Sequence, residues 1–132
     1  MDNGPLVIEE IEAAEQLLRE FDEYAPIKVA FWMRTTDEEQ RYLYIASDRI
    51  GAEGVSDAYG EVVRIGLKIQ SPYFNVFRVK VIDSATPLAR AALEARDRFP
   101  PHMPARLGGS WFGGVAAADV YVYPALDHAK AP

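Results

Sequence analysis

The sequence predicts an α+β fold, a two-layer sandwich in which a mixed sheet of four or five strands carries about three helices on one side. Apolar residues recur every three or four positions, as one face of a helix requires, in residues 7–23, 56–68 and 84–99. Runs rich in β-branched and aromatic residues, which are typical of strands, occupy residues 27–34, 40–47, 75–83 and 119–123. These segments follow one another in the order α-β-β-α-β-α-β, and the glycine-rich region before the last strand leaves room for one more.

Length and composition agree with a single domain spanning residues 1–132. Of the residues, 49% are hydrophobic and 26% are charged, which are ordinary values for a globular protein. The chain has no cysteine, which excludes a disulfide framework, a thiolate zinc site and a cysteine nucleophile. No apolar run approaches the ~18 residues of a membrane span, and residues 1–5 lack the features of a signal peptide. We therefore expect a cytoplasmic protein without a membrane partner.

The net charge of −6 is concentrated in one segment. Residues 1–24 contain eight acidic side chains and one basic side chain, whereas residues 25–132 contain 13 basic and 12 acidic ones. The acidic residues share the segment 7–23 with an apolar stripe, which predicts an acidic amphipathic helix that ends before Pro26. The overall acidity therefore does not exclude an anionic ligand that binds far from this helix.

The strands expected at 27–34 and 40–47 form a hairpin whose register can be predicted from side-chain alternation. Pairing Arg34 with Gln40 collects the aliphatic side chains on one side and the aromatic ones on the other, through the pairs Trp32–Tyr42 and Ala30–Tyr44. A shift by one residue would instead place Tyr42 and Tyr44 beside Phe31 and Val29. We prefer the first register because it collects the aliphatic residues into one core-facing set, with the pairs Phe31–Leu43 and Val29–Ile45.

The middle of the chain contains a predicted turn at 51–54, a helix at 56–68 with Ser56 as its expected N-cap, and a strand at 75–83. The strand alternates clearly, because apolar and basic side chains point in opposite directions: Phe77, Val79 and Val81 on one side, Arg78 and Lys80 on the other. We therefore assign Arg78 and Lys80 to the same side of the sheet as the aromatic residues of the hairpin.

The helix at 84–99 has the clearest boundaries, because Thr86 can cap it and Pro87 can occupy its first position. Its alanines predict close packing against the sheet. Three prolines within residues 100–104 predict an extended connector. The last strand, at 119–123, is followed by a tail at 125–132 that we expect to be frayed.

The side of the sheet opposite the aliphatic set is the first candidate binding surface. Aromatic and basic side chains alternate on it, and the candidate residues are Trp32, Arg34, Tyr42, Tyr44, Arg78 and Lys80. One interpretation is that a helix covers this side and the basic side chains extend past it. A second is an interface with another copy of the chain or with a protein partner, since Trp, Tyr and Arg are enriched at such contacts. A third is single-stranded nucleic acid, whose bases stack on rings and whose phosphates meet cations.

The second candidate is the glycine-rich segment 108–114, Gly-Gly-Ser-Trp-Phe-Gly-Gly, with Arg106 just before it. Backbone N–H groups freed by the glycines could hold an anion together with Ser110 and Arg106, although the segment matches neither the phosphate-binding loop nor the dinucleotide fingerprint. The structural alternative is that Trp111 and Phe112 fill the edge of the core while the glycines allow a tight bend or bulge.

Catalytic and metal-binding patterns are weak. The two histidines, His102 and His128, are 26 residues apart, and Ser110 lacks the Gly-x-Ser-x-Gly elbow. We expect no metal and no cofactor. If the protein is an enzyme, the candidate set around a phosphorylated substrate is Arg34, Asp37, Arg41, Arg78 and His102.

Taken together, the residues favour a non-enzymatic interaction protein that associates with itself, or with a protein partner. The expected contact is the aromatic-basic side of the sheet with the glycine-rich segment, including Trp111. The alternatives are a binder of single-stranded nucleic acid or of a nucleotide or phosphate ligand at the same surface, and a small enzyme acting on a phosphorylated substrate.

Overall fold

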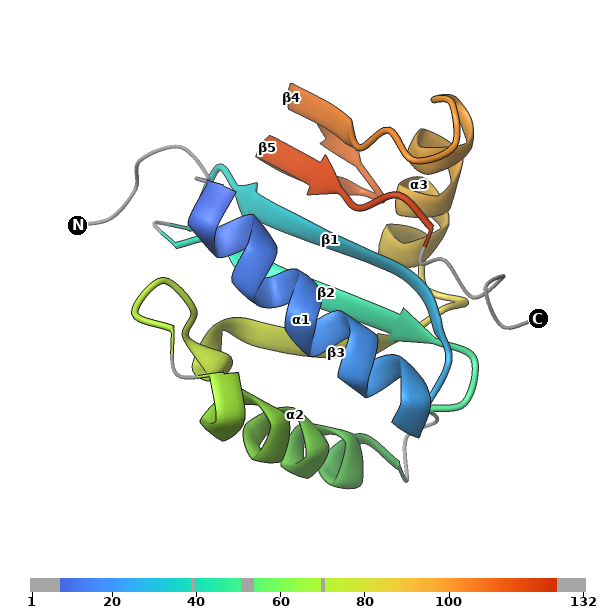
Figure 1. The fold of residues 1–132 in the computed structure, drawn as a ribbon. Helices are drawn as coiled ribbons and strands as arrows, with labels where there is room; N and C mark the ends of the chain where they lie inside the picture. Colours follow the sequence, from blue (N-terminus) through green and yellow to red (C-terminus); the bar gives the residue numbers. More distant parts are fainter. Residues whose placement is uncertain (1–7, 39, 51–53, 70, 126–132) are drawn as a thin grey trace.

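The computed structural model describes residues 8–38, 40–50, 54–69 and 71–125, and within them the α+β fold is confirmed (Figure 1). The described strands form a five-stranded sheet in the order β3-β2-β1-β5-β4. Their bounds are β1 Ile27–Thr35, β2 Tyr42–Ser47, β3 Val79–Asp83, β4 Ala105–Phe112 and β5 Val115–Val122. Only the β2–β3 pair is parallel, so the sheet is mixed, as the sequence predicts.

Two of the described helices pack on one face of the sheet. Helix α1 (Ile8–Tyr24) and helix α2 (Val55–Ile69) turn their apolar stripes toward β1, β2 and β3, with α1 lying across β1 in Figure 1. Phe21 of α1 and Ile65 of α2 are fully buried against Trp32 and its neighbours. Helix α2 begins at Val55, so Ser56 lies inside its first turn and is not the N-cap that the sequence suggests.

Helix α3 (Pro87–Asp97) packs on the opposite face, which corrects the expectation that all helices cover one side. Its start agrees with the prediction, since the Thr86 side chain accepts a hydrogen bond from the Ala89 backbone N–H at 3.2 Å. The buried stripe consists of alanines, Ala89, Ala92 and Ala95. These small side chains let the helix approach β1, β4 and β5 closely, and the molecule therefore has three layers.

Each face of the sheet is only half covered by helices. On one face α1 and α2 cover β1, β2 and β3, and no described helix lies over β5 and β4. On the other face α3 covers β1, β5 and β4, and none of the described helices lies over β3. The central strand β1 is thus covered on both faces, and five of its nine residues, Val29–Met33, are buried.

The β1–β2 register preferred from the sequence is wrong by one residue. Phe31 pairs with Tyr44, Trp32 with Leu43 and Met33 with Tyr42. Tyr44 therefore stacks on Phe31, with ring centroids 4.9 Å apart and planes at 5°. The alternation could not select the register because a strand buried on both faces is apolar at successive positions.

The strand predicted at 75–83 is shorter than expected. Residues Val76–Arg78 form a 3₁₀ turn, η2, which is capped by the Asn75 side chain accepting from the Phe77 N–H, and β3 starts only at Val79. Phe77 is 82% exposed, so it does not share a buried side with Val79 and Val81 as the alternation suggests.

The glycine-rich segment forms the end of a β-hairpin. Phe112 pairs with Val115, so Gly113 and Gly114 are a two-residue loop, and both have positive φ (60° and 90°) as a type I′ turn requires. A Cβ atom on Gly113 would lie 2.7 Å from the Leu88 Cα, so glycine is also needed because the turn touches the start of α3. The predicted final strand at 119–123 is thus the second half of a longer strand, β5, beginning at Val115.

A second irregularity in this hairpin lies at Gly109, whose φ is +60°. Leu107 and Phe112 both face the α3 side although they are five positions apart, so the side-chain alternation of β4 reverses once between them. On β5, Ala117 and Val120 show the same reversal. The bend expected from the glycines is present. The turn predicted at 51–54 and the tail at 125–132 lie outside the described residues, apart from Gly54 and Ala125.

Candidate interaction surface

Trp32, the first candidate binding residue, is part of the core. It is 3% exposed beneath α1, and its indole Nε1 donates a hydrogen bond to the Tyr123 hydroxyl at 2.9 Å. The Tyr123 hydroxyl in turn donates to the Ile11 carbonyl at 2.9 Å, which ties β1, the end of β5 and α1 together. Burial raises the pKa of Tyr123 far above its ordinary value. This group of side chains is structural.

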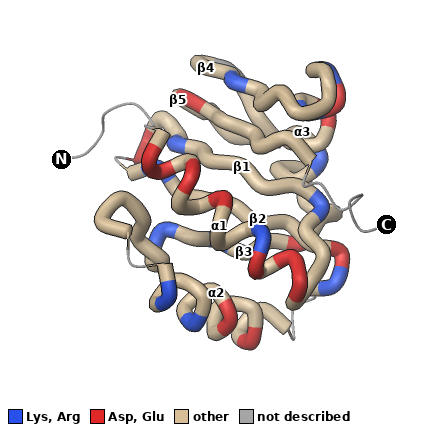
Figure 2. The backbone as a smooth tube through the Cα atoms, viewed as in Figure 1, with Lys and Arg blue, Asp and Glu red and all other residues tan. Residues whose placement is uncertain are grey.

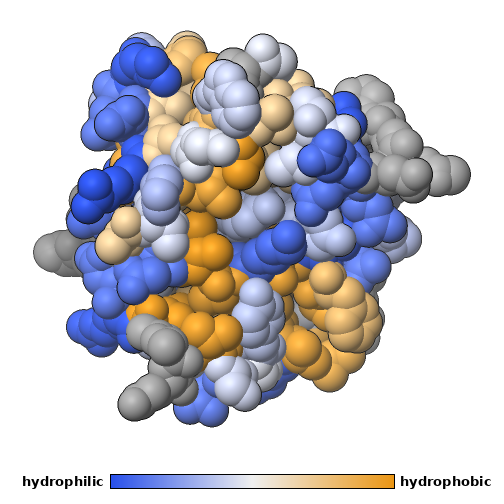
Figure 3. Space-filling view, turned by 180° about the vertical axis from the view of Figure 1, so that it is seen from behind, coloured by the Kyte–Doolittle hydropathy of each residue, from blue (hydrophilic) through white to orange (hydrophobic). Residues whose placement is uncertain are grey.

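Tyr42, Tyr44 and Lys80 lie on the opposite face from Trp32 because of the register, so the structure divides the predicted aromatic-basic set. The Lys80 ammonium is 4.2 Å from the Tyr42 ring centroid, 5.5 Å from that of Tyr44 and 3.7 Å from Glu38 Oε2. Burial raises the pKa of Tyr44, which the Lys80 charge partly opposes. Figure 3 shows this face, where apolar surface extends across the middle of the molecule.

Arg34 shares the carboxylate of Asp119 with Arg41. Its Nε is 3.3 Å from Oδ2 of Asp119 on β5, and Nε of Arg41, just before β2, is 3.2 Å from Oδ1 of the same carboxylate. Asp119 thus compensates two cations of which Arg41 is almost fully buried, and it was not recognised from the sequence. Arg78 lies apart from this cluster, in η2.

Arg106 and Trp111 both lie on β4, five positions apart, at the end of the α1 face that no described helix covers. The Arg106 guanidinium carbon is 4.9 Å from the ring centroid of Tyr121 on β5, the distance of a cation–π contact. Trp111 is 76% exposed, whereas its neighbour Phe112 is buried, so only one of the two aromatics fills the core edge. Ser110 directly precedes Trp111 on β4 and pairs in register with Ala117 of β5.

We call the part of the α1 face that none of the described helices covers the open half-face; it comprises Arg34, Arg106, Trp111, Asp119 and Tyr121. Figure 1 shows β4 and β5 free of helices on this side. Acidic residues of α1 border it, and Figure 2 shows them along the helix. Burial raises the pKa of Tyr121, with a smaller opposing effect of Arg106 and a further rise from Glu15 of α1. The open half-face is therefore aromatic and cationic beside an acidic helix.

The open half-face ends at β4, which is an edge strand of the sheet. At the other edge, the Val81 N–H of β3 donates to the Tyr59 hydroxyl of α2 at 2.9 Å, so a side chain occupies its outward backbone. In the described part of the chain, no hydrogen bond from a helix or loop reaches the outer edge of β4. An edge strand of eight residues with free backbone groups is a template for pairing with another strand.

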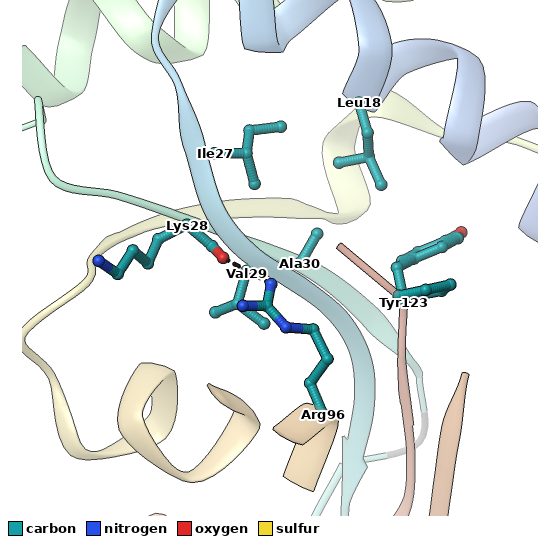
Figure 4. A pocket seen from close by; sticks show the side chains of 8 residues that line it. Leu18, Ile27, Lys28, Val29, Ala30, Arg96 and Tyr123 are labelled. Carbon is teal, nitrogen blue, oxygen red and sulfur yellow. Dashed lines mark hydrogen bonds between the residues drawn. The ribbon is translucent and has the colours of Figure 1, made fainter. Parts of the chain in front are cut away.

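The described pockets provide little room for a ligand in the interior. The pocket in Figure 4, between α1, β1 and α3, has a volume of about 10 Å³, which is space for no more than one water. Arg96 closes it by donating from Nη1 to the Lys28 carbonyl at 2.9 Å. Shallow hollows elsewhere include one around His102, at the opposite end of the sheet from Arg34. Of the residues of the enzymatic alternative, Arg34 and Arg41 meet at Asp119, whereas His102 and Arg78 lie apart from them.

No group of three or more metal-ligating side chains occurs among the described residues. No described helix has the length and apolar character to cross a membrane. Comparison with known protein families, with curated proteins and with solved structures finds no match to this chain.

Proposed function

We propose that this is a non-enzymatic interaction protein that self-associates through the open half-face and the edge of β4. The observation that carries the proposal is Trp111, a large aromatic side chain that is 76% exposed on an edge strand whose outward backbone no other described element engages. The proposed contact surface is aromatic and basic, as expected from the sequence, but it consists of other residues. Trp32 and Tyr44 are buried, and the aromatic ring beside Arg106 is that of Tyr121.

The free energy expected from covering Trp111 supports a contact at the open half-face. A tryptophan buries 150–250 Å² at a contact, so covering most of Trp111 would contribute about 3 kcal/mol at ~25 cal/mol per Å². Arg106, stacked on Tyr121, adds a residue type enriched at the energetic centres of interfaces. Ion pairs at the rim would add little, since exposed pairs contribute at most ~1 kcal/mol.

The test is native mass by light scattering over a range of protein concentrations. We expect the wild-type chain to dimerise and Trp111→Ser to weaken the dimer about 10⁴-fold, the equivalent of about 3 kcal/mol for each of the two copies of Trp111. Phe77→Ser is the matched control, since Phe77 is also a large exposed aromatic (82%) but lies at the β3 side of the sheet. Neither substitution should lower the stability of the monomer, because neither side chain is buried within one chain.

A protein that stays monomeric at all concentrations would contradict the proposal. Equal weakening by Trp111→Ser and Phe77→Ser would also contradict it, because the effect would then come from general surface hydrophobicity and not from the open half-face.

A second candidate function is binding of single-stranded nucleic acid at the same surface. It is favoured by the presence of two arginines and two aromatic rings on one surface, where Arg106 lies against Tyr121 and the open half-face also contains Arg34 and Trp111. The acidic α1 beside the site opposes it, since α1 would repel phosphates. Titration of the tryptophan fluorescence with short single-stranded RNA distinguishes nucleic-acid binding from self-association. Phosphate contacts make the affinity for RNA fall steeply as the salt concentration rises, whereas the proposed self-association depends little on salt. No quenching at low salt would exclude nucleic acid.

A further inference from the structure

We infer that the partner at this surface is a second copy of the chain, joined through antiparallel pairing of β4 with β4 so that Arg106 of each copy lies opposite Trp111 of the other. This inference rests on the proposed self-association and adds the pairing geometry. A two-fold axis between Gly108 and Gly109 relates the two strands. The pairs are then Arg106 with Trp111, Leu107 with Ser110 and Gly108 with Gly109.

The reversal of alternation at Gly109 makes this pairing possible. Residues directly opposite one another in an antiparallel pair point to the same face of the sheet. Arg106 and Trp111, five positions apart, would face opposite sides in a regular strand. Because the alternation reverses between Leu107 and Phe112, both side chains point to the open half-face. Glycine with φ +60° at position 109 is therefore what makes this strand self-complementary.

Charge selects this register over its neighbours. Arg106 is the only charged residue of β4. A two-fold axis at Arg106 would place the two cations directly opposite each other, which is unfavourable across a strand pair. In the register proposed here each guanidinium, already against Tyr121 at 4.9 Å, would also meet the ring of the second copy's Trp111. The three side chains would form one stack across the interface, and the stack occurs twice.

The arrangement of the rest of the molecule permits this dimer. Pairing extends the sheet to ten strands, in which the two open half-faces join on one side and the two α1 helices flank them. Helix α1 lies over β1, so the two acidic helices would be ~24 Å apart, five strand spacings of ~4.8 Å. That distance exceeds the Debye length of ~8 Å at physiological ionic strength, so their repulsion would be largely screened. The β3 edge cannot substitute, because Tyr59 occupies its backbone.

The chain contains no cysteine, so introduced cysteines report the register without background. Arg106→Cys and Trp111→Cys are prepared separately and oxidised alone and as an equimolar mixture. Opposite residues have Cα atoms ~4.5–5.5 Å apart, within the range of a disulfide. Residue 106 of one copy would be ~17 Å from residue 106 of the other, which is too far. We expect a covalent dimer in the mixture only, since a mixed pair also keeps one intact contact between Arg106 and Trp111.

A covalent dimer formed by either variant alone would overturn the register, because it would place two copies of one residue opposite each other. Absence of a cross-link in the mixture while the wild-type chain dimerises and Trp111→Ser does not would overturn the register and leave self-association standing. A wild-type monomer would instead remove the proposed function together with this inference.

A charge exchange gives a second test that needs no oxidation. Trp111→Lys should abolish the dimer in light scattering, because it places a cation opposite Arg106. Adding Arg106→Glu to Trp111→Lys should restore at least a tenth of the wild-type association constant, since each position would again face an attractive partner. Lack of any restoration, in a double variant with unchanged circular dichroism, would overturn the pairing of positions 106 and 111.

Discussion

Strands β3 and β4 both form an edge of the same sheet, but another element occupies the outward backbone of β3 alone. The β3 strand has five residues, and the Val81 N–H donates to the Tyr59 hydroxyl of α2. The β4 strand has eight residues, its outer side meets no hydrogen bond from another described element, and its largest side chain, Trp111, is exposed. Edge strands that are short or blocked by a side chain resist pairing with other chains. The difference indicates that the fold protects one edge and leaves the other available.

The faces next to these edges differ in the same way. Beside β3, the Lys80 ammonium lies against Tyr42 and Glu38, so its charge is already compensated within the chain. Beside β4, Arg106 rests on Tyr121, on the same strand as the exposed Trp111. Cation–π contacts occur at both ends of the sheet, but only the one at β4 lies next to an open edge.

Of the substitutions that test the difference between the two edges, Gly113→Ala should have the largest effect on stability, because it disturbs the hairpin that forms the β4 edge. A Cβ atom there would lie 2.7 Å from Leu88 Cα and 2.9 Å from Pro87 O, and the φ of +60° disfavours alanine. Left-handed strain of ~1–2 kcal/mol together with overpacking of ~1–3 kcal/mol predicts a loss of about 3 kcal/mol in the free energy of unfolding. Denaturant unfolding measures it.

Gly60→Ala is the matched control, because Gly60 lies inside α2, has no positive φ, and leaves a Cβ atom with no neighbour within 4 Å. Alanine there should stabilise the protein by up to ~1 kcal/mol, since glycine lowers helix stability by that amount. If both variants lose the same stability, the contact between the turn and α3 is not what requires glycine at 113.

Tyr59→Phe should have an intermediate effect, and it tests the protection of the β3 edge. The substitution removes the acceptor of the Val81 N–H, and a buried donor without a partner costs ~1–3 kcal/mol. We expect a loss of about 2 kcal/mol in unfolding free energy and a new concentration-dependent association that Trp111→Ser does not abolish. Tyr73→Phe, at a half-exposed residue outside the strand pairs, should change neither quantity. A variant that loses stability but shows no new association would mean that β3 is too short to pair.

The smallest effect concerns alkaline pH. Burial raises the pKa of Tyr123 in the folded state above the ~10 of an unfolded chain, so the stabilisation is complete below pH ~10 and is lost as the pH rises further. The slope is about 1.4 kcal/mol per pH unit for each such tyrosine, because the unfolded state binds fewer protons there. Burial also raises the pKa values of Tyr44, toward β3, and Tyr121, toward β4. Both residues therefore add to the decline of stability with rising pH.

Tyr123→Phe should therefore unfold at lower denaturant concentration at about pH 8, having lost the hydrogen bonds to Trp32 and Ile11, but should show a flatter decline above pH ~10. Urea midpoints between about pH 8 and pH 11.5 measure both. An unchanged slope in this variant would contradict the assignment of the alkaline loss to Tyr123.

Much of the local structure could be predicted from the sequence because short-range signals define it. Thr86 and Pro87 mark the start of α3, and the alanines of that helix indicate its close packing. The glycines at 113 and 114 form the turn of a hairpin, although the sequence suggested only a bend. The interaction surface was harder, since Asp119 and Tyr121 stand in a strand that showed no sign of meeting Arg34 and Arg106.

The sequence by itself determined the helices, most of the strands, their order and the α+β class, because caps, prolines and apolar periodicity act within a few residues. Only the tertiary structure decided the β1–β2 register, the division of helices between both faces and the burial of Trp32. These depend on which segments far apart in the chain compete for the two sides of β1, and β1 is apolar on both. The same competition placed β4 at an edge and left Trp111 exposed.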